Sequence, residues 1–113
     1  MKTITVLLSI FFLMIFSGCN KCNNENPTAR VVNNGTSSAS LQITASNGDV
    51  ISITDLGSGL VSSSESYWPG TTVVNCTVDG VQLTETVEMS ECTSYDLTIN
   101  SQNEIVVFSQ TLD

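Results

Sequence analysis

The fold prediction starts from residues 74–85, which read Val-Asn-Cys-Thr-Val-Asp-Gly-Val-Gln-Leu-Thr-Glu. Asp79 and Gly80 both accept the positive φ angles that a two-residue hairpin loop requires. A two-residue loop fixes which residues face one another across the hairpin. On one face the pairs are Val78 with Val81, Cys76 with Leu83 and Val74 with Glu85. On the other face they are Thr77 with Gln82 and Asn75 with Thr84. One face is therefore apolar except for Glu85 at its rim, which is typical of a sheet that covers one side of a core.

Short stretches with the same two-residue period recur along the chain, and no segment has a sustained helical period. The predicted strands lie at residues 29–33, 40–45, 50–54, 60–64, 72–78, 81–88, 95–100 and 104–109. About seven or eight short strands at this spacing predict an all-β fold, an antiparallel two-sheet sandwich of immunoglobulin-like or transthyretin-like type. A single domain is expected at 28–113. Its apolar run at 105–108 is expected to be buried on both faces.

The first residues have the layout of a secretory signal. A positive start at 1–3 is followed by a mostly apolar run at 4–16, which is too short to span a bilayer as a permanent helix. The sequence Phe16-Ser17-Gly18-Cys19 resembles the lipobox of bacterial lipoproteins, although leucine is usual where Phe16 stands. The resemblance implies that residues 1–18 are removed and that Cys19 carries acyl groups. An ordinary cleaved signal and a transmembrane anchor are the alternatives.

Residues 19–27 have no apolar periodicity and are predicted to form a flexible, solvated tether. The chain combines the lipobox, this tether, a first strand that ends at Asn33-Asn34, Pro69-Gly70-Thr71 at the start of a strand, and a late turn that contains a cysteine. In these features it resembles small β-sandwich lipoproteins common in Bacteroidetes. That resemblance implies a lipid-anchored protein of the cell envelope, with the outer membrane as the expected location. It carries no activity and no site residue. The tether lacks the acidic run that often accompanies surface export in that group, so both the periplasmic and the surface orientation are kept.

Charge and composition exclude several function classes. The chain has 3 basic and 11 acidic residues and a net charge of −8. Loss of Lys2 with the leader leaves 2 basic against 11 acidic side chains, a net charge of −9. Lys21 and Arg30 are too few to neutralise nucleic-acid phosphates or to attract an anionic membrane surface.

The chain contains no histidine, which removes the commonest general base and the usual zinc ligand. We therefore expect no enzyme, no cofactor and no metal, with catalysis by carboxylates alone as the alternative. Four carboxylates could supply oxygen ligands to calcium, but without a calcium-loop pattern a solvated acidic face is expected for them: Glu85, Glu88, Glu91 and Asp96.

Three cysteines remain if Cys19 is acylated, and an exported protein permits disulfides. The favoured pair is Cys76 with Cys92, which closes a loop of about sixteen residues. A straight hairpin would separate these two cysteines by roughly 20 Å, so the bridge requires that the second strand bends or crosses to the other sheet. A Cys22–Cys92 bridge and the absence of any bridge are the alternatives.

Tyr67 and Trp68 form the aromatic cluster that stands out after the leader. In a loop, both rings could stack against a sugar face, with Glu65 accepting hydrogen bonds. The alternative has one ring capping an open end of the sandwich and the other half exposed. It is favoured because adjacent residues of an extended chain point to opposite faces.

These observations predict a non-enzymatic, lipid-anchored lipoprotein that serves as an accessory or interaction module. Its expected partners are the membrane, through the lipid anchor, and an unidentified protein or glycan. One alternative is glycan binding through Tyr67 and Trp68. Another is a fibre or pilus-like subunit that assembles by strand addition at exposed sheet edges.

Overall fold

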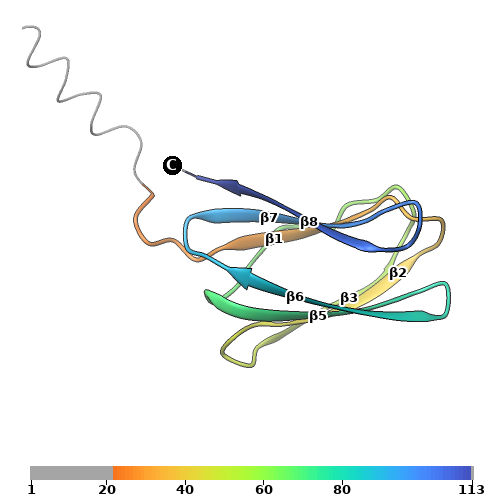
Figure 1. Ribbon diagram of the computed structural model, residues 1–113, viewed down its shortest axis with the longest axis horizontal. Helices are drawn as coiled ribbons and strands as arrows, with labels where there is room; N and C mark the ends of the chain where they lie inside the picture. Colours follow the sequence, from red (N-terminus) through yellow and green to blue (C-terminus); the bar gives the residue numbers. More distant parts are fainter. Residues whose placement is uncertain (1–21, 113) are drawn as a thin grey trace, which may run out of the picture.

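The computed structural model describes residues 22–112 and contains only strands and connecting segments in that range (Figure 1). The strands are β1 (Thr28–Asn33), β2 (Ala39–Thr44), β3 (Val50–Leu56), β4 (Glu65–Ser66), β5 (Gly70–Val78), β6 (Val81–Met89), β7 (Thr93–Ile99) and β8 (Ile105–Thr111). The described residues include no helix with the length and apolarity needed to cross a membrane.

Two four-stranded sheets face each other in a sandwich (Figure 1). One has the order β4-β1-β7-β8 and the other the order β3-β2-β5-β6. Every neighbouring pair is antiparallel except β1 and β7, which run parallel from the pair Thr28 and Ser94 to the pair Asn33 and Ile99. The predicted all-β two-sheet sandwich is confirmed, with this one parallel pair as the departure from a fully antiparallel arrangement.

The hairpin of β5 and β6 has the register predicted from its sequence. Cys76 lies opposite Leu83, Val74 opposite Glu85 and Asn75 opposite Thr84. Asp79 and Gly80 have φ angles of 51° and 73°, the combination that a tight two-residue turn needs. The turn residues and the two-residue alternation therefore agree on one register.

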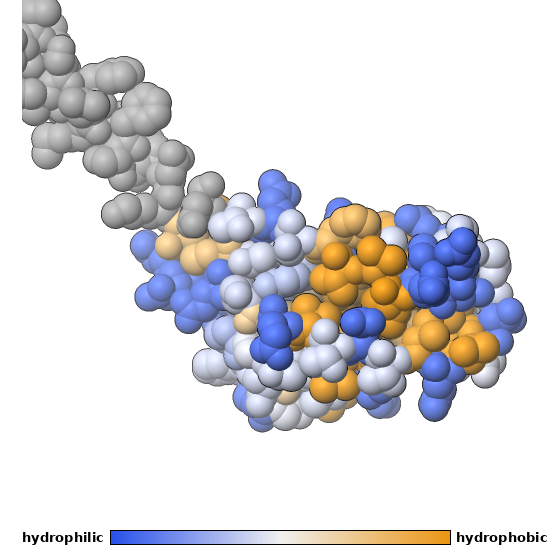
Figure 2. Space-filling view, viewed as in Figure 1, coloured by the Kyte–Doolittle hydropathy of each residue, from blue (hydrophilic) through white to orange (hydrophobic). Residues whose placement is uncertain are grey.

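The core lies between the two sheets and is built from the alternate residues of their strands. In β7 every second side chain is buried, from Thr93 to Ile99. The apolar side chains that fill the space between the sheets include Val31, Leu97 and Ile99 on one side and Leu41, Ile43, Val74 and Val78 on the other. Figure 2 shows that the outer surface is mostly polar, with apolar surface over the gap between the sheets on the face in view.

Two of the predicted local features are wrong. The strand expected at 60–64 is reduced to one bridge between Val32 and Val61, followed by the short β4. Here the Ser62 hydroxyl oxygen accepts a hydrogen bond from the backbone N–H of Val31 at 2.8 Å, so a side chain competes with the regular ladder. The run 105–108 is not buried on both faces, because β8 is an edge strand and Phe108 is 58% exposed.

Asn33 is a fully buried polar side chain at the end of β1. Its Nδ2 donates to the carbonyl oxygens of Ser37 at 2.9 Å and Leu56 at 2.8 Å, and its Oδ1 accepts from the N–H of Gly35 at 2.9 Å. The backbone of Asn33 also bonds with Leu60 and Gly59. This one side chain therefore fixes two connecting segments against the end of the first strand.

We predict that Asn33→Ala lowers the free energy of unfolding by about 2–4 kcal/mol, because buried backbone groups lose their partners. Urea denaturation followed by circular dichroism measures this. The exposed neighbour provides a control: Asn34→Ala should change the stability by less than about 0.5 kcal/mol. Equal effects of the two substitutions would contradict the role given to Asn33.

Candidate functional site

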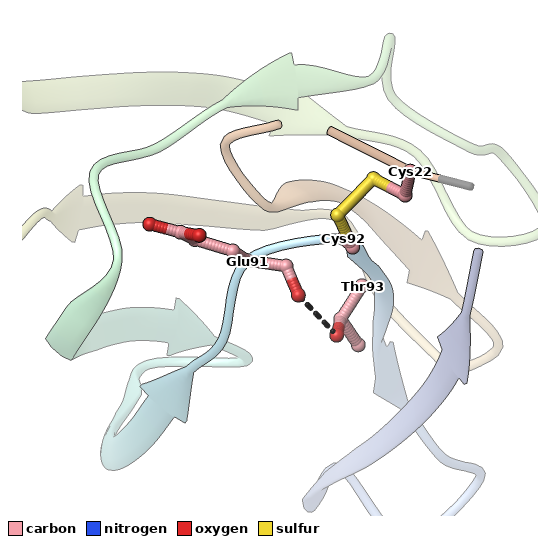
Figure 3. The surroundings of a disulfide bond; sticks show 4 residues. All are labelled: Cys22, Glu91, Cys92 and Thr93. Atoms are coloured by element: carbon pink, nitrogen blue, oxygen red, sulfur yellow. Dashed lines mark hydrogen bonds between the residues drawn. A yellow bond between two sulfur atoms is a disulfide. The ribbon is translucent and has the colours of Figure 1, made fainter. Parts of the chain in front are cut away.

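A disulfide joins Cys22, ahead of β1, to Cys92, between β6 and β7, with their Cα atoms 5.8 Å apart (Figure 3). The preferred prediction of a Cys76–Cys92 bridge is therefore wrong, and the Cys22–Cys92 alternative is the pair found. The reason is the straight hairpin. Cys76 points into the core opposite Leu83, whereas Cys92 lies beyond the far end of β6. Cys76 is a free buried thiol, and its removal from water raises its pKa.

The segment from Cys22 to β1 is held against the sandwich. The N–H of Cys92 donates to the carbonyl oxygen of Glu25, and the N–H of Tyr67 donates to that of Pro27, both at 2.9 Å. Pro27 itself is buried. The predicted flexible tether at 19–27 is therefore wrong for residues 22–27. Residues 19–21, the signal at 1–18 and the acylation of Cys19 lie outside the described residues.

The two adjacent aromatic residues have different environments. Tyr67 is in the core and only 3% exposed, whereas Trp68 is 53% exposed. Burial, with a smaller contribution from the charge of Glu65, raises the pKa of Tyr67 to about 12. Tyr67 cannot stack on a ligand from this position, so the pair does not form the shared platform that the glycan alternative required. The arrangement found is the alternative to a shared sugar platform, in which one ring is buried and the other is exposed.

The carboxylates considered for calcium lie on separate surfaces. Glu85 is exposed on the edge strand β6, and Glu88 on the opposite face of that strand accepts a hydrogen bond from the Thr71 hydroxyl at 2.7 Å. Asp96 lies in the other sheet and binds Arg30. Glu91 lies beside the disulfide (Figure 3). Within residues 22–112 no three side chains of His, Cys, Asp or Glu are grouped so that they could hold a metal ion.

The outer surface of the β4-β1-β7-β8 sheet brings together an aromatic ring and an ion pair. Arg30 of β1 donates from Nε to Asp96 Oδ1 at 2.8 Å and from Nη2 to Asp96 Oδ2 at 3.2 Å. Asp96 of β7 lies opposite Phe108 of β8 in the register, so the three side chains form a row across three strands. Arg30 is the one basic residue within the described range. The row therefore combines an exposed apolar ring with the cation and a carboxylate.

This row borders a shallow concavity of about 380 Å³, which we call the Arg30 face. It is lined by Thr28, Arg30, Ser64, Ser94, Tyr95, Asp96, Phe108, Ser109 and Gln110. The hydrogen bond and the charge of Arg30 lower the pKa of Asp96, which keeps this carboxylate ionised. The surface thus offers hydroxyl, amide, carboxylate and guanidinium groups around an accessible ring.

A second concavity, of about 390 Å³, lies on the other sheet. Its lining comes from β2, β3, β5 and β6 and contains no aromatic and no charged residue. It offers mainly the amides and hydroxyls of side chains such as Gln42, Asn75 and Thr84. The Arg30 face has the more varied chemistry of the two, although it is not the larger.

Sequence reasoning missed the Arg30 face. The two-residue period puts Arg30 on an outward face of its strand, and the scarcity of cations after the leader singles it out. No local pattern indicates that β1 pairs with β7. This pairing brings Arg30 beside Asp96, which already lies opposite Phe108 in the β7–β8 hairpin.

No protein-family model matches the sequence, and no curated protein matches it. Among solved structures, the chain is similar to the NMR structure of a protein from Eubacterium rectale, with a TM-score of 0.50 and 20% sequence identity. The similarity covers 78% of this chain and 91% of the other. At this identity the likeness shows the fold alone.

We predict that Cys22→Ser lowers the free energy of unfolding by about 2–4 kcal/mol, because the bridge constrains a long loop of the unfolded chain. Urea denaturation with and without a reductant measures this, and the reductant should not destabilise the variant further. Peptide mapping of the non-reduced protein should join Cys22 to Cys92 and leave Cys76 as a thiol. A peptide that joins Cys76 to Cys92 would contradict the pairing.

Proposed function

We propose that the chain is a non-enzymatic, lipid-anchored protein of the bacterial cell envelope that serves as an accessory or interaction module. The observation that carries this proposal is the attachment of residues 22–27 to the sandwich by the disulfide and by backbone hydrogen bonds. Because these residues closely follow the lipobox-like sequence, a lipid on Cys19 would hold the whole folded domain at the membrane. The domain would face the periplasm or the cell exterior.

The absence of an enzymatic role is proposed on two grounds. The sequence contains no histidine, and the carboxylates occupy separate surfaces of the domain. Asp96 is engaged by Arg30 and Glu88 by Thr71, so neither is paired with a second carboxylate for acid–base work.

Within the sandwich class we propose the transthyretin-like type. In the immunoglobulin arrangement the first two strands share a sheet with the fourth and fifth. In this chain β1 and β2 belong to different sheets, and β1 lies between β4 and β7. The strand orders β4-β1-β7-β8 and β3-β2-β5-β6 thus depart from the immunoglobulin pattern, which supports the other of the two types considered.

A second candidate function, glycan binding, is favoured by the Arg30 face and no longer by Tyr67 and Trp68. A sugar ring offers an apolar face, for which the accessible ring of Phe108 is a partner, and an edge of hydroxyls. The fork formed by Arg30 and Asp96 provides donors and acceptors for those hydroxyls. The flanking Ser and Gln side chains of the Arg30 face add further polar groups.

The anchor is tested by expression in a bacterium with lipoprotein processing. The protein should take up labelled fatty acid and partition into the detergent phase, and Cys19→Ala should abolish both. Cys76→Ala is the matched control, because it removes a thiol outside the lipobox and should leave labelling intact. Labelling that persists in Cys19→Ala would contradict the anchor.

The glycan candidate is tested with an array of bacterial cell-wall and capsular polysaccharides. Phe108→Ala should weaken binding at least tenfold, or about 1.4 kcal/mol. Its melting temperature should change little, because the ring is more than half exposed. Val106→Ala serves as the control, since Val106 is exposed on the same strand and does not line the Arg30 face. Absence of binding to every glycan, or equal binding by Phe108→Ala, would reject this candidate.

A further inference from the structure

One end of the sandwich gathers the disulfide and the exposed tryptophan. We call it the anchor end, and define it by Cys22, Cys92, Trp68 and Leu112. The N–H of Leu112 donates to the carbonyl oxygen of Cys92 at 2.8 Å, which places the end of β8 beside the disulfide. Trp68 directly follows Tyr67, whose N–H binds Pro27. Figure 1 shows the start of β1 and the end of β8 at the same end of the molecule.

The position of Trp68 at this end is fixed by its neighbours on both sides. Tyr67 is tied to Pro27, and the carbonyl oxygen of Pro69 accepts a hydrogen bond from the Ser46 hydroxyl at 2.7 Å. The next residue, Gly70, pairs with Met89, three residues before Cys92. The short segment that carries Trp68 therefore cannot move far from the anchor end without breaking these contacts.

The chain between the proposed lipid and the disulfide is very short. Cys19 and Cys22 are three residues apart, so their Cα atoms can be separated by at most about 11 Å. Acyl chains on Cys19 would hold that residue at the level of the lipid headgroups. The disulfide then transfers the same restraint to Cys92 and so to the anchor end of both sheets.

The anchor end presents apolar side chains to its surroundings. Trp68 is 53% exposed, and Leu112 is 45% exposed. In the order β4-β1-β7-β8, Trp68 follows the strand at one edge and Leu112 follows the strand at the other, with Cys92 leading into β7. Three inter-strand steps, roughly 14 Å, separate these edge strands, and the strand that Cys92 leads into lies between them.

Charge decides which lipid surface this end fits. Glu25, Asp49 and Glu91 are exposed near it, and among the described residues there is no lysine or arginine there. The sequence adds one cation, Lys21, directly before Cys22, so the three carboxylates still outnumber it. An anionic surface would repel these carboxylates, whereas a zwitterionic one would not. Tryptophan is enriched at the level of the headgroups because its ring is apolar and its N–H can still donate a hydrogen bond.

From these observations we infer that the sandwich stands end-on upon a zwitterionic phospholipid bilayer, with Trp68 and Leu112 in its interface. The inference rests on the proposed acylation of Cys19. Trp68 is then a membrane-contact residue, and the turn at Asp79-Gly80, at the other end of β5 and β6, lies at the end directed away from the lipid.

The chain has a single tryptophan, so its fluorescence reports Trp68 alone. The processed protein is purified from a bacterium with lipoprotein processing, and its acylation is measured by mass spectrometry. It is then reconstituted into phosphatidylcholine–phosphatidylethanolamine vesicles. The emission of Trp68 should shift to shorter wavelength, be quenched by bromine-labelled acyl chains and be protected from aqueous iodide. The non-acylated Cys19→Ala protein should show none of these changes.

Two variants test the geometry. In Trp68→Phe combined with Val81→Trp, the reporter moves to an exposed position beside the opposite turn. It should stay open to iodide and unaffected by the brominated chains. Loss of the disulfide in Cys22→Ser with Cys92→Ser should reduce the protection of Trp68 although the lipid remains. Circular dichroism verifies that both variants keep their β-structure.

The possible outcomes distinguish failure of the end-on orientation from failure of the proposed acylation of Cys19. Absence of acyl groups on Cys19 would overturn the proposed anchor and the inference together. An acylated protein whose Trp68 remains accessible to iodide and unquenched by brominated lipid would overturn the inference alone. Equal quenching of the reporters at positions 68 and 81 would overturn the end-on orientation.

Discussion

The attachment of the N-terminal segment to β7 is the constraint on which the other features depend. It consists of the Cys22–Cys92 bond at one end and the parallel ladder of β1 with β7 behind it. The ladder joins β4 and β1 to β7 and β8 in one sheet, and it brings Arg30 into contact with Asp96. The bond removes the freedom expected of a tether. Without this attachment, neither the Arg30 face nor the anchor end would exist as a defined surface.

The sequence was most informative where the interactions are local. The β5–β6 register follows from Asp79-Gly80 and from alternation alone, because a two-residue loop determines every opposite pair. Partners far apart in sequence were not predictable. Alternation assigns Arg30 to an outward face but does not indicate that β7 lies beside it. In the same way, cysteine spacing left the Cys22–Cys92 bridge as one of several choices. The burial of one ring of the Tyr67-Trp68 pair could be expected, because adjacent residues of an extended chain point to opposite faces. The Arg30 face could not be predicted, because it depends on the pairing of β1 with β7.

The four edge strands differ in how they discourage pairing with another chain. β4 has only 2 residues, and β3 is irregular where its partner β2 shifts register between Ala39 and Leu41. In β6, the charged Glu85 lies on the face that is directed toward the other sheet, and it is exposed there at the edge. Such devices are typical of sheet edges in natural proteins. β8 has neither a charge nor a proline. If the protein assembled by strand addition, β8 is the edge that it would use.

The position of the end of β8 beside the disulfide has a practical consequence for attaching cargo to this domain. A polypeptide fused after Leu112 would leave the sandwich on the side from which residues 22–27 enter. With Cys19 acylated as proposed, this polypeptide would compete for space with the lipid surface. The hairpin turn at Asp79-Gly80 lies at the other end of the molecule, where both residues are exposed. An epitope or a small binding loop inserted there would lie at the end of the domain opposite the disulfide.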